Sequence, residues 1–575
     1  MRILSSKMDT HEKVIDLALR RGFLWPSFEI YGGASGFYDF GPLGATLKKK
    51  LEDKWREYYC IREGFLEISS PAVAPEEVFI ASGHVSSFVD PMVECRKCKE
   101  VYKATDLIKE ALGIKADGLS YKELEELIKK NNVHCPSCGG ELSEVWSFNL
   151  MFKTHIGPGS KKVGYLRPET AQAMFMLFNR LYGFYRKKLP FGVAQLGRVY
   201  RNEISPRQGV IRLREFSQAE VEIFVNPKEK THKDFRKYVN EELRLVPGDG
   251  REITLHARDA VRKKIIMHEL LAYHLILVKK FLEEVGIPRE KLRFRQHMRT
   301  EMAHYAADCW DAEALTERFG YIEVVGIADR TDYDLKAHIK HSGADLSAFL
   351  QFEKPQVIEK TVLEANLAKV GSKFKEKTGK ILNAIKNLGE KEITFFEKKG
   401  YIDLKIDGEN IRLDKNYLST KKVKERLTGE KIIPHVIEPS YGIDRIIYCV
   451  LESAYKENGE RKILSLKNSV APIETAVFPL VAKEELTMPA LEIYEDLKSY
   501  NFFCIYDEAD SIGRRYARVD EIGVPYAITV DFDGLKDGTA TIRERDSTEQ
   551  KRIKVKEVSK ILKDLLEGKV EFKEL

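Results

Sequence analysis

Arginine and glutamate residues crowd one stretch of the chain in a pattern that could bind a phosphorylated substrate. The stretch reads RVYRNEISPRQGVIRLREFSQAEVE, from Arg198 to Glu222. Its charged residues include Arg201, Glu203, Arg207, Arg212, Arg214, Glu215, Glu220 and Glu222. Arginines held on a sheet can bind a polyphosphate through paired hydrogen bonds, and Phe216 can stack on a purine. A surface ladder of salt bridges is the alternative that this pattern leaves open.

A strand, a turn and a second strand would position these side chains. Residues two apart along a strand share one face of a sheet. We therefore expect Arg201 and Glu203 on one face of the first strand. The even-numbered residues from Phe216 to Glu222 should share one face of the second strand.

Four cysteines have the spacing of a metal site. They are Cys95, Cys98, Cys135 and Cys138, two C-x2-C pairs separated by 36 residues. Four thiolates suit tetrahedral zinc. The spacer exceeds the roughly 15 to 20 residues of common sites, but a helix expected near 121–130 can fill it. We predict structural zinc; reduced or redox-active thiols are the alternative, and His134 is a substitute ligand.

Three common catalytic motifs are missing from the sequence. There is no GxxxxGK[ST] phosphate loop, no HExxH zinc motif and no GxSxG nucleophile turn. In HELLAYH, which begins at His268, the histidines lie six residues apart, so they do not share a helix face. The arginine-rich stretch is therefore the main chemical signal.

Length and composition describe a multidomain globular protein. The 575 residues suggest about four domains. Hydrophobic residues make up 43% and charged residues 32%, which excludes a disordered or collagen-like chain. The net charge of +6 is too small to demand a nucleic-acid partner. No apolar run approaches the roughly 18 residues of a membrane span, and no signal peptide opens the chain, so we expect a cytoplasmic location without membrane contact.

The elements that must position these residues alternate along the chain. Clustered glycines at 31–44 predict a tight loop before a helix through LKKKLEDKWREYY, and the strand FLEIS follows and stops at Pro71. Further strands are expected at VWSFNLMF, PFGVAQLGRVY, REFSQAEVEIFV and YIEVVGIAD, with helices such as TAQAMFMLFNRLYGFY between them. This order predicts an α+β protein with insertions.

Three segments resemble the signature motifs of class II aminoacyl-tRNA synthetases. YRNE, a loop and REF resemble motif 2, and HVIEPSYGIDR (435–445) resembles motif 3. The helix through Trp55 and the strand ending at Pro71 resemble motif 1, the dimer-forming element. Within the class, YDFGPLG, LRPETAQ, RNEISPRQG and EPSYGIDR are similar to glycyl-tRNA synthetases of the archaeal and eukaryotic homodimeric type, and the resemblance covers nearly the whole chain.

The resemblance implies a class II antiparallel-sheet catalytic core with insertions, followed by a C-terminal α/β anticodon-binding domain. The expected segments are 1–84 (core with motif 1), 85–148 (zinc-knuckle-like insertion), 149–226 (core with motif 2), 227–300 (insertion), 301–350 (core), 351–431 (lysine-rich insertion), 432–468 (core with motif 3) and 469–575 (anticodon-binding domain).

The resemblance also implies residues that act on ATP. Arg201 would bind the α-phosphate and the substrate carboxylate, and Arg445 would bind the γ-phosphate. Phe216 would stack under adenine, and Glu323 would bind ATP together with Mg²⁺. The implied ATP site is Arg201, Asn202, Glu203, Ile211, Arg212, Leu213, Arg214, Glu215, Phe216, Glu323, Val324, Gly442 and Arg445, with Arg201, Glu203 and Arg445 as the catalytic residues.

Glycine offers an ammonium group and no side chain to bind. By resemblance its site is Glu169, Phe216, Gln218, Glu220, Glu438, Pro439, Ser440 and Gly442. Carboxylates that converge without a cation raise one another's pKa, so such a cluster favours a cation. A pocket too small for a methyl group would reject other amino acids by size.

The implied activity is ATP-dependent ligation of glycine to the 3′ end of tRNA(Gly) by a homodimer that uses Mg²⁺; the structural Zn²⁺ is expected from the cysteine spacing. A noncatalytic, nucleic-acid-binding accessory protein of the same fold is the alternative. Such a protein would be expected to lose the charged ATP-binding residues, and this sequence keeps them.

Charge differs between two regions. Residues 354–431 hold 19 lysines and arginines against 12 acidic residues, and we expect either a solvated face or contact of Lys421, Lys422 and Lys424 with tRNA phosphates. From 471 onward the chain is acidic, with 16 basic and 22 acidic residues. The arginines within 514–518 are candidates for anticodon contact or, equally, a solvated cluster.

Overall fold

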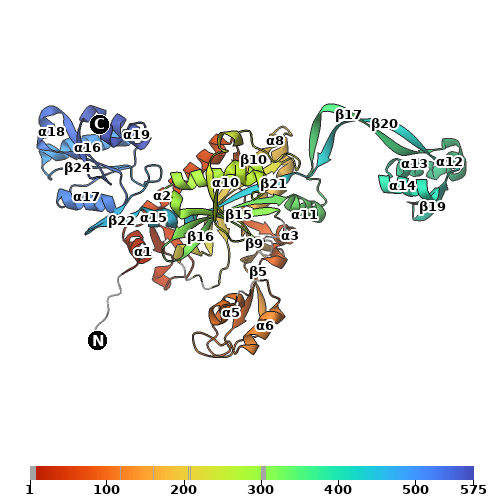
Figure 1. The fold of residues 1–575 in the computed structure, drawn as a ribbon, viewed down its shortest axis with the longest axis horizontal. Helices are drawn as coiled ribbons and strands as arrows, with labels where there is room; N and C mark the ends of the chain where they lie inside the picture. Colours follow the sequence, from red (N-terminus) through yellow and green to blue (C-terminus); the bar gives the residue numbers. More distant parts are fainter. Residues whose placement is uncertain are drawn as a thin grey trace. The chain divides into compact units, whose positions relative to one another are not determined.

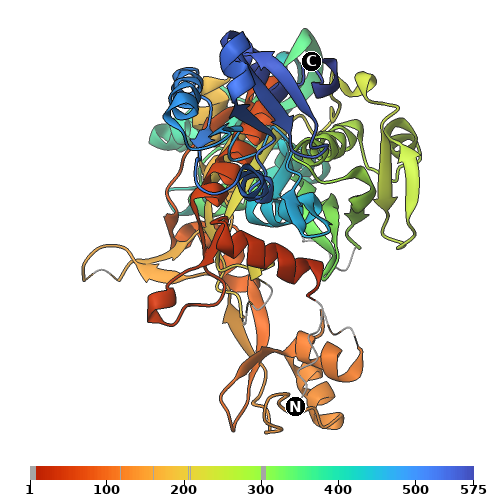
Figure 2. The ribbon, with the colours of Figure 1, turned by 90° about the vertical axis from the view of Figure 1, so that its left-hand side faces the viewer.

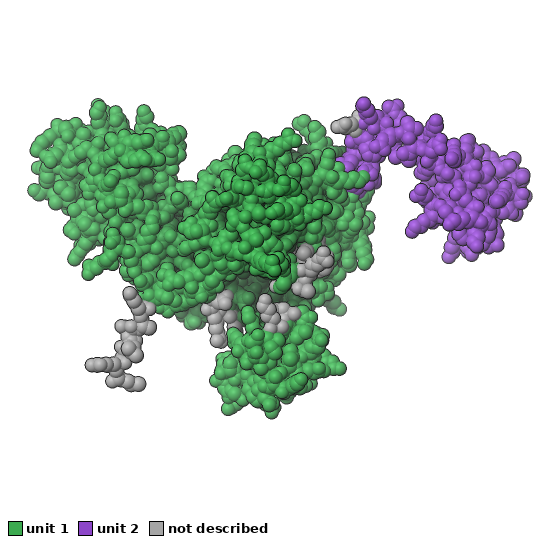
Figure 3. Space-filling view, in the orientation of Figure 1, with its two compact units in different colours: residues 1–346, 433–575 green, residues 347–432 purple. Residues whose placement is uncertain are grey.

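The computed structural model describes residues 8–575 except 115, 117, 160, 205, 207, 208 and 299–305. Arg207 of the arginine-rich stretch therefore lies outside the described residues. The chain forms two compact units (Figure 3), residues 1–346 with 433–575 and residues 347–432. Within the described residues, no helix is both long and apolar enough to cross a membrane.

A large sheet forms the centre of the first unit (Figure 1). Nine strands of the described chain form it, in the order β13 (Ile253–His256), β12 (Glu242–Val246), β14 (Leu292–Gln296), β15 (Asp308–Thr316), β16 (Gly320–Thr331), β21 (His435–Gly442), β11 (Glu215–Val225), β10 (Phe191–Tyr200) and β3 (Leu66–Ile68). Neighbouring strands are antiparallel except β12 with β14 and β10 with β3. The expected α+β fold with an antiparallel core is confirmed.

Three helices cover one face of this sheet: α2 (Pro42–Arg56), α10 (Glu269–Glu284) and α15 (Ile443–Ala454). Ala219, Val221 and Ile223 of β11 are buried in the core that these helices share with the sheet. Because side chains alternate along a strand, the even-numbered residues 218–222 lie on the opposite face, as expected. The first unit's other core helices are α1 (Thr10–Arg20), α3 (Glu76–Ala81), α4 (His84–Ser87), α7 (Ala171–Met176), α8 (Phe178–Phe184), α9 (Ala257–Arg262) and α11 (Tyr333–Ser342).

The glycine cluster before α2 has a steric cause. Gly41 caps the helix and Pro42 opens it, where its missing N–H costs no hydrogen bond. A Cβ on Gly44 would lie 1.8 Å from the carbonyl oxygen of Phe23. Only glycine therefore lets the helix pack this closely against the preceding chain.

The segment with the cysteine pairs folds as a small module with its own core (Figure 2). It contains β5 (Val89–Glu94), β6 (Val101–Lys103), β7 (Trp146–Asn149), α5 (Ala104–Leu112) and α6 (Tyr121–Lys130). Ser120 and Glu123 form a capping box at the start of α6, and the helix expected near 121–130 is confirmed.

The second unit is a long two-stranded ribbon that ends in a helical module. Its elements are β17 (Ala348–Ala365), α12 (Leu367–Phe374), α13 (Thr378–Lys386), α14 (Glu390–Lys399), β18 (Tyr401–Ile406), β19 (Glu409–Asp414) and β20 (Leu418–Ile432). On the ribbon, Lys421 bonds Glu364 at 2.8 Å and Lys422 lies 3.7 Å from Glu359. Carboxylates thus partly offset the lysine charge, and the expected phosphate contact stays a prediction.

Residues from 475 onward form a second, five-stranded sheet with helices. Its elements are β24 (Thr475–Pro479), α16 (Glu484–Ser499), β25 (Cys504–Tyr506), α17 (Ile512–Glu521), β26 (Tyr526–Val530), α18 (Phe532–Asp537), β27 (Thr539–Glu544), β28 (Gln550–Lys554) and α19 (Val558–Leu566). Arg515 is only 1% exposed and donates to the carbonyl oxygens of Pro479 and Leu480. A guanidinium buried in this way is structural, so Arg515 is excluded as an anticodon contact. Arg518 pairs with Asp507 and Asp510.

Candidate active site

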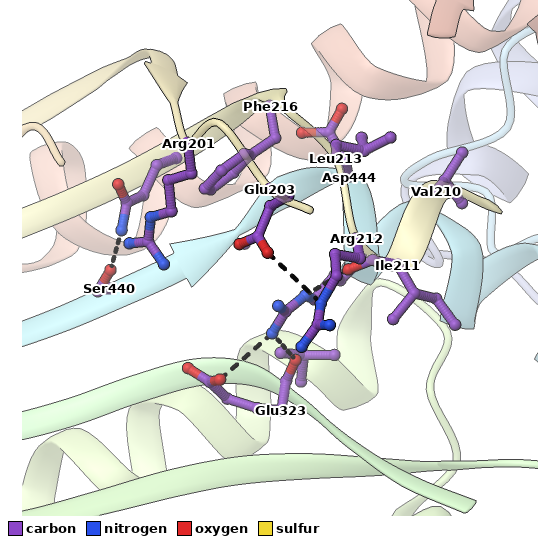
Figure 4. Close-up of a pocket in the computed structure, with 14 residues that line it drawn as sticks. Arg201, Glu203, Val210, Ile211, Arg212, Leu213, Phe216, Glu323, Ser440 and Asp444 are labelled. Atoms are coloured by element: carbon purple, nitrogen blue, oxygen red, sulfur yellow. Dashed lines mark hydrogen bonds and ion pairs between the residues drawn. The ribbon is translucent and has the colours of Figure 1, made fainter. Parts of the chain in front are cut away.

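A cleft with about 80 Å³ of space for water-sized molecules opens on the central sheet beside the start of α15 (Figure 4). It is lined by Arg201, Glu203, Val210, Ile211, Arg212, Leu213, Phe216, Gln218, Glu323, Val324, Ser440, Gly442, Asp444 and Arg445. Residues from β11, β16, β21, the start of α15 and the loop between β10 and β11 meet here.

The loop after β10 supplies two of the expected charged residues. Arg201 and Glu203 lie beyond the end of the strand at Tyr200, so the expectation that both are strand residues is wrong. The Arg201 guanidinium is 5.3 Å from the centre of the Phe216 ring, and its Nε donates to the carbonyl oxygen of Pro168. Glu203 lies 3.7 Å from Arg212 (Figure 4). All of these side chains except Pro168 line the cleft.

Arg445 and Glu323 form the opposite wall. Arg445 stands in the first turn of α15 and donates to the carbonyl oxygens of Ile211 and Glu323, at 2.9 and 3.0 Å. It also bonds the Glu323 carboxylate at 3.2 Å. The pairing of β15 with β16 shifts register beside Glu323, and such a bulge re-aims side chains. Both charged side chains are accessible to a ligand, since Glu323 is 51% and Arg445 35% exposed.

Asp444 is a lining residue that the sequence reasoning missed. Its carboxylate accepts a hydrogen bond from the Ser217 backbone N–H at 2.5 Å, which ties α15 to β11. Burial raises the pKa of this carboxyl above its usual range. Its place beside Arg445 in the GIDR motif was the signal that could have identified it.

Seven residues of the implied sites are not among those that line the cleft in the described structure: Glu169, Asn202, Arg214, Glu215, Glu220, Glu438 and Pro439. Arg214 instead donates to the carbonyl oxygens of Glu203 and Ser35, bracing the loop after β10. The Glu215 carboxylate lies 3.7 Å from Arg198.

A chain of hydrogen bonds leads from the cleft to a buried carboxylate. Gln218 donates to the Ser440 hydroxyl at 2.7 Å, and Ser440 donates to Glu220 at 2.8 Å. The other Glu220 oxygen accepts from the backbone N–H and the hydroxyl of Thr170. Burial and the nearby charge of Glu169 raise the pKa of Glu220. The serine and the carboxylate expected at the glycine site are therefore in contact.

Glu438 is held by a buried arginine that the sequence reasoning missed. Arg330 donates to Glu438 at 2.7 Å and binds Asp334 through two further hydrogen bonds. Burial raises the pKa of Glu438 to about 8; Arg330 opposes the rise, while Glu220 and Glu169 add to it. Arg330, at the end of YIEVVGIADR, belongs to no recognisable motif, so the sequence does not indicate its partner. The pairing of β16 with β21 brings it to Glu438.

Glu169 has a different environment from the other carboxylates. Burial would raise its pKa, but His84 and Arg330 outweigh burial and hold the pKa below its usual range. Gln172 donates to it at 2.7 Å. The three carboxylates whose oxygens lie within 4.8 Å of one another are instead Glu220, Glu222 and Glu438.

The four cysteine sulfurs converge in the small module. The Sγ atoms of Cys95 and Cys138 are 3.5 Å apart, and those of Cys98 and Cys135 are 3.6 Å apart. Tetrahedral zinc with sulfur at about 2.3 Å requires neighbouring sulfurs about 3.8 Å apart. A Cβ on Gly140 would lie 2.9 Å from the Cys95 sulfur, so glycine keeps this space open. The donor set fits zinc without His134, which lies outside the four-sulfur cluster.

Comparisons with known proteins agree with this architecture. A profile of the tRNA synthetase class II core domain (G, H, P, S and T) matches residues 159–335, and one of the anticodon binding domain matches residues 474–565. A solved Giardia lamblia prolyl-tRNA synthetase in complex with prolyl-adenylate shares the fold with a TM-score of 0.53 at 14% identity, over 97% of this chain and 79% of that one. Fold and cleft together define a class II aminoacyl-tRNA synthetase.

Full-length relatives narrow the class. The chain is 53% identical over 572 residues to the glycine–tRNA ligase of Methanocaldococcus jannaschii, covering 97% of this chain and 99% of the relative. It is 52% identical to that of Pyrococcus furiosus, over 98% of this chain and 100% of the relative. The chain belongs to the glycine–tRNA ligase family.

Proposed function

We propose that the protein activates glycine with ATP and transfers it to the 3′ end of tRNA(Gly). One observation carries the proposal: Ser440, which lines the arginine-rich cleft, donates a hydrogen bond to the buried carboxylate of Glu220. Membership of the ligase family supports the same function. One compartment suits a polyphosphate and the other suits an ammonium group.

In the first step the carboxylate of glycine attacks the α-phosphorus of ATP, and pyrophosphate leaves. No nucleophilic side chain is needed, because positioning and charge stabilisation lower the barrier. Arg201, at the boundary of the two compartments, would neutralise the charge that develops on the α-phosphate. Arg445 and Arg212 would bind the outgoing phosphates, and Phe216 would stack on adenine.

Glu220, Glu438 and Ser440 would bind the ammonium group of glycine. Their support is geometric: Ser440 already donates to Glu220, so the carboxylate is fixed, and Arg330 fixes Glu438. Glu169 lies next to this set, 3.9 Å from Arg330, and would add negative charge. Because these groups are held by hydrogen bonds, they would not move easily to admit a larger side chain, which agrees with selection of glycine by size.

In the second step the ribose hydroxyl of the terminal adenosine of tRNA attacks the carbonyl carbon of the adenylate, and AMP leaves. The domain that matches anticodon binding would contact the other end of the tRNA. Arg515 is not part of the surface that would contact the tRNA, because its side chain is buried.

Two metals belong to the proposal. Mg²⁺ bound with ATP would neutralise phosphate charge, and Glu323 is the accessible carboxylate placed to hold it. Zn²⁺ would be held by Cys95, Cys98, Cys135 and Cys138 and would stabilise the module, whose own core is small.

We also propose that two chains associate through α2 and β3. β3 is an edge strand of the central sheet and shows Leu66 at 46% exposure, with Ile61 at 75% exposure close before it. Unpaired strand edges with apolar side chains are sites where proteins associate. The expected cytoplasmic location stays a prediction.

The noncatalytic alternative is disfavoured. The charged residues expected to be lost in an accessory protein are present, and Arg201, Glu203, Arg212 and Arg445 line one cleft. Charging of tRNA(Gly) transcript with labelled glycine tests the proposal. Ester-linked glycine that forms only with ATP supports it. Binding of tRNA by the folded protein without any charging supports the accessory protein instead.

A further inference from the structure

Glu222 is a carboxylate for which the proposed reaction has no task. It lies on β11, two residues beyond Glu220 and on the same face. The register of β11 with β21 pairs Glu220 with Ser440 and Ile223 with Ile437. That register sets Glu222 opposite Glu438.

Glu222 differs from its neighbours in having nothing to bind. Glu220 accepts hydrogen bonds from Thr170 and Ser440, and Glu438 is held by Arg330. Glu222 is 0% exposed, and neither of its oxygens has a hydrogen-bond partner in the described structure. Yet one of its oxygens lies within 4.8 Å of an oxygen of both other carboxylates.

An ionised carboxylate is unfavourable in this position. It would be a buried anion without a donor, beside two further carboxylates. Burial and the charges of Glu438, Glu220 and Asp334 raise the pKa of Glu222 well above its usual range, although the nearby Arg330 opposes the rise. The neutral acid, in contrast, carries an O–H that can donate to a neighbouring carboxylate and adds no charge.

We propose that Glu222 is a protonated carboxylic acid that positions Glu438, and through it the ammonium group of glycine. The inference rests on the proposed function, because it assigns Glu438 to the ammonium group. Arg330 donates a hydrogen bond to Glu438. The carboxyl group of Glu222, on the adjacent strand β11, lies within 4.8 Å of a Glu438 oxygen. Glu222 is thus a positioning residue that completes the glycine pocket without adding a further negative charge.

Two substitutions distinguish a neutral acid at Glu222 from an ionised carboxylate and from a side chain that only fills space. E222Q replaces the acid with a neutral side chain of the same shape that still donates a hydrogen bond. E222M keeps the bulk but cannot donate. The readout is glycine-dependent ATP–pyrophosphate exchange by the full-length enzyme, with KM for glycine and for ATP measured separately.

The proposal expects E222Q to keep KM for glycine within about threefold of the wild type. It expects E222M to raise KM for glycine about tenfold or more while KM for ATP changes little. If E222Q is as damaged as E222M, Glu222 works as an anion and the proposal is wrong. If E222M is as active as E222Q, Glu222 merely fills space, which also overturns it.

An infrared measurement gives a readout without catalysis and does not need a folded E222M. At about pH 9, above the pKa of about 8 of Glu438, the wild type should still show a carbonyl band of a protonated carboxylic acid, and E222Q should lack that intensity. The matched control is E313Q, because Arg293 and Arg295 bind that buried carboxylate; it should leave the band intact. A band unchanged by E222Q overturns the proposal. If ATP–pyrophosphate exchange by the wild type does not depend on glycine, the proposed function is wrong. The infrared result on the protonation of Glu222 would still stand, because it does not require catalysis.

Discussion

Arg201 joins the two compartments of the site, so its charge should matter most in the transition state. Its guanidinium lies over Phe216 and close to the strand that carries Glu220. We predict that R201Q slows glycine-dependent ATP–pyrophosphate exchange about a hundredfold or more, because a positioned donor to the reacting phosphate is lost. Steady-state exchange rates measure this. Near-normal exchange would show that Arg201 is not at the α-phosphate.

The buried state of Glu438 predicts a pH dependence of glycine binding. Burial raises its pKa to about 8, and an ammonium group binds the ionised form. Below that pH a proton must leave as glycine binds, so affinity should rise with pH and level off above about 8. KM for glycine should therefore fall between about pH 6.5 and about pH 8.5, by at most about tenfold per pH unit, with a smaller change for ATP. A glycine KM independent of pH over this range contradicts the assignment of Glu438.

Residues with a motif were easier to predict than residues without one. Strand alternation alone places Gln218, Glu220 and Glu222 on one face, and the structure confirms it. The roles of Arg330 and Glu222 could be assigned only from the structure, because strand pairing brings them close to partners that are distant in sequence. The sequence also led us to group Glu169 with Glu220 and Glu438, whereas the tight cluster contains Glu222.

At the scale of elements, the cysteine module should depend on its metal. Its four sulfurs stand at nearly tetrahedral spacing, and the core around them is small. We predict about one zinc per chain, lost when Cys95 and Cys98 are both changed to serine. Metal analysis by mass spectrometry measures this. The control changes Cys60 and Cys504, which lie outside the cluster. Zinc retained by the first variant, or lost from the control, would move the site elsewhere.

Elements were predicted well where periodicity was strong. The strands now at 191–200, 215–225 and 320–331 and the helix at 121–130 were all expected. The start of the loop after β10 was placed too late, because the alternation of RNE continues the strand pattern although the strand ends at Tyr200. The bulge beside Glu323 was also missed, since a register shift depends on the partner strand.

At the scale of the whole molecule, we predict a dimer. Light scattering at micromolar concentration should give twice the chain mass. Placing lysine at Ile61 and Leu66 together should lower that mass toward the monomer, because it puts charge on the exposed apolar side of the α2–β3 edge. The matched control places lysine at Met488, which is 53% exposed on α16 and outside the central sheet, and should keep the dimer. A monomeric wild type contradicts the interface.

The central claim is that the carboxylate pocket beside the ATP cleft selects glycine. ATP–pyrophosphate exchange, measured separately with each standard amino acid, tests it most directly, because exchange reports the first step without tRNA. The carboxylates bind an ammonium group that every amino acid has, so on our proposal the hydrogen-bonded set around Ser440 must select glycine by excluding a side chain. We predict strong exchange with glycine and, for alanine, a loss of at least about a hundredfold in kcat/KM, since a pocket rejects larger substrates well. Exchange driven by alanine, serine or proline as well as by glycine, or by another amino acid and not by glycine, would contradict the account.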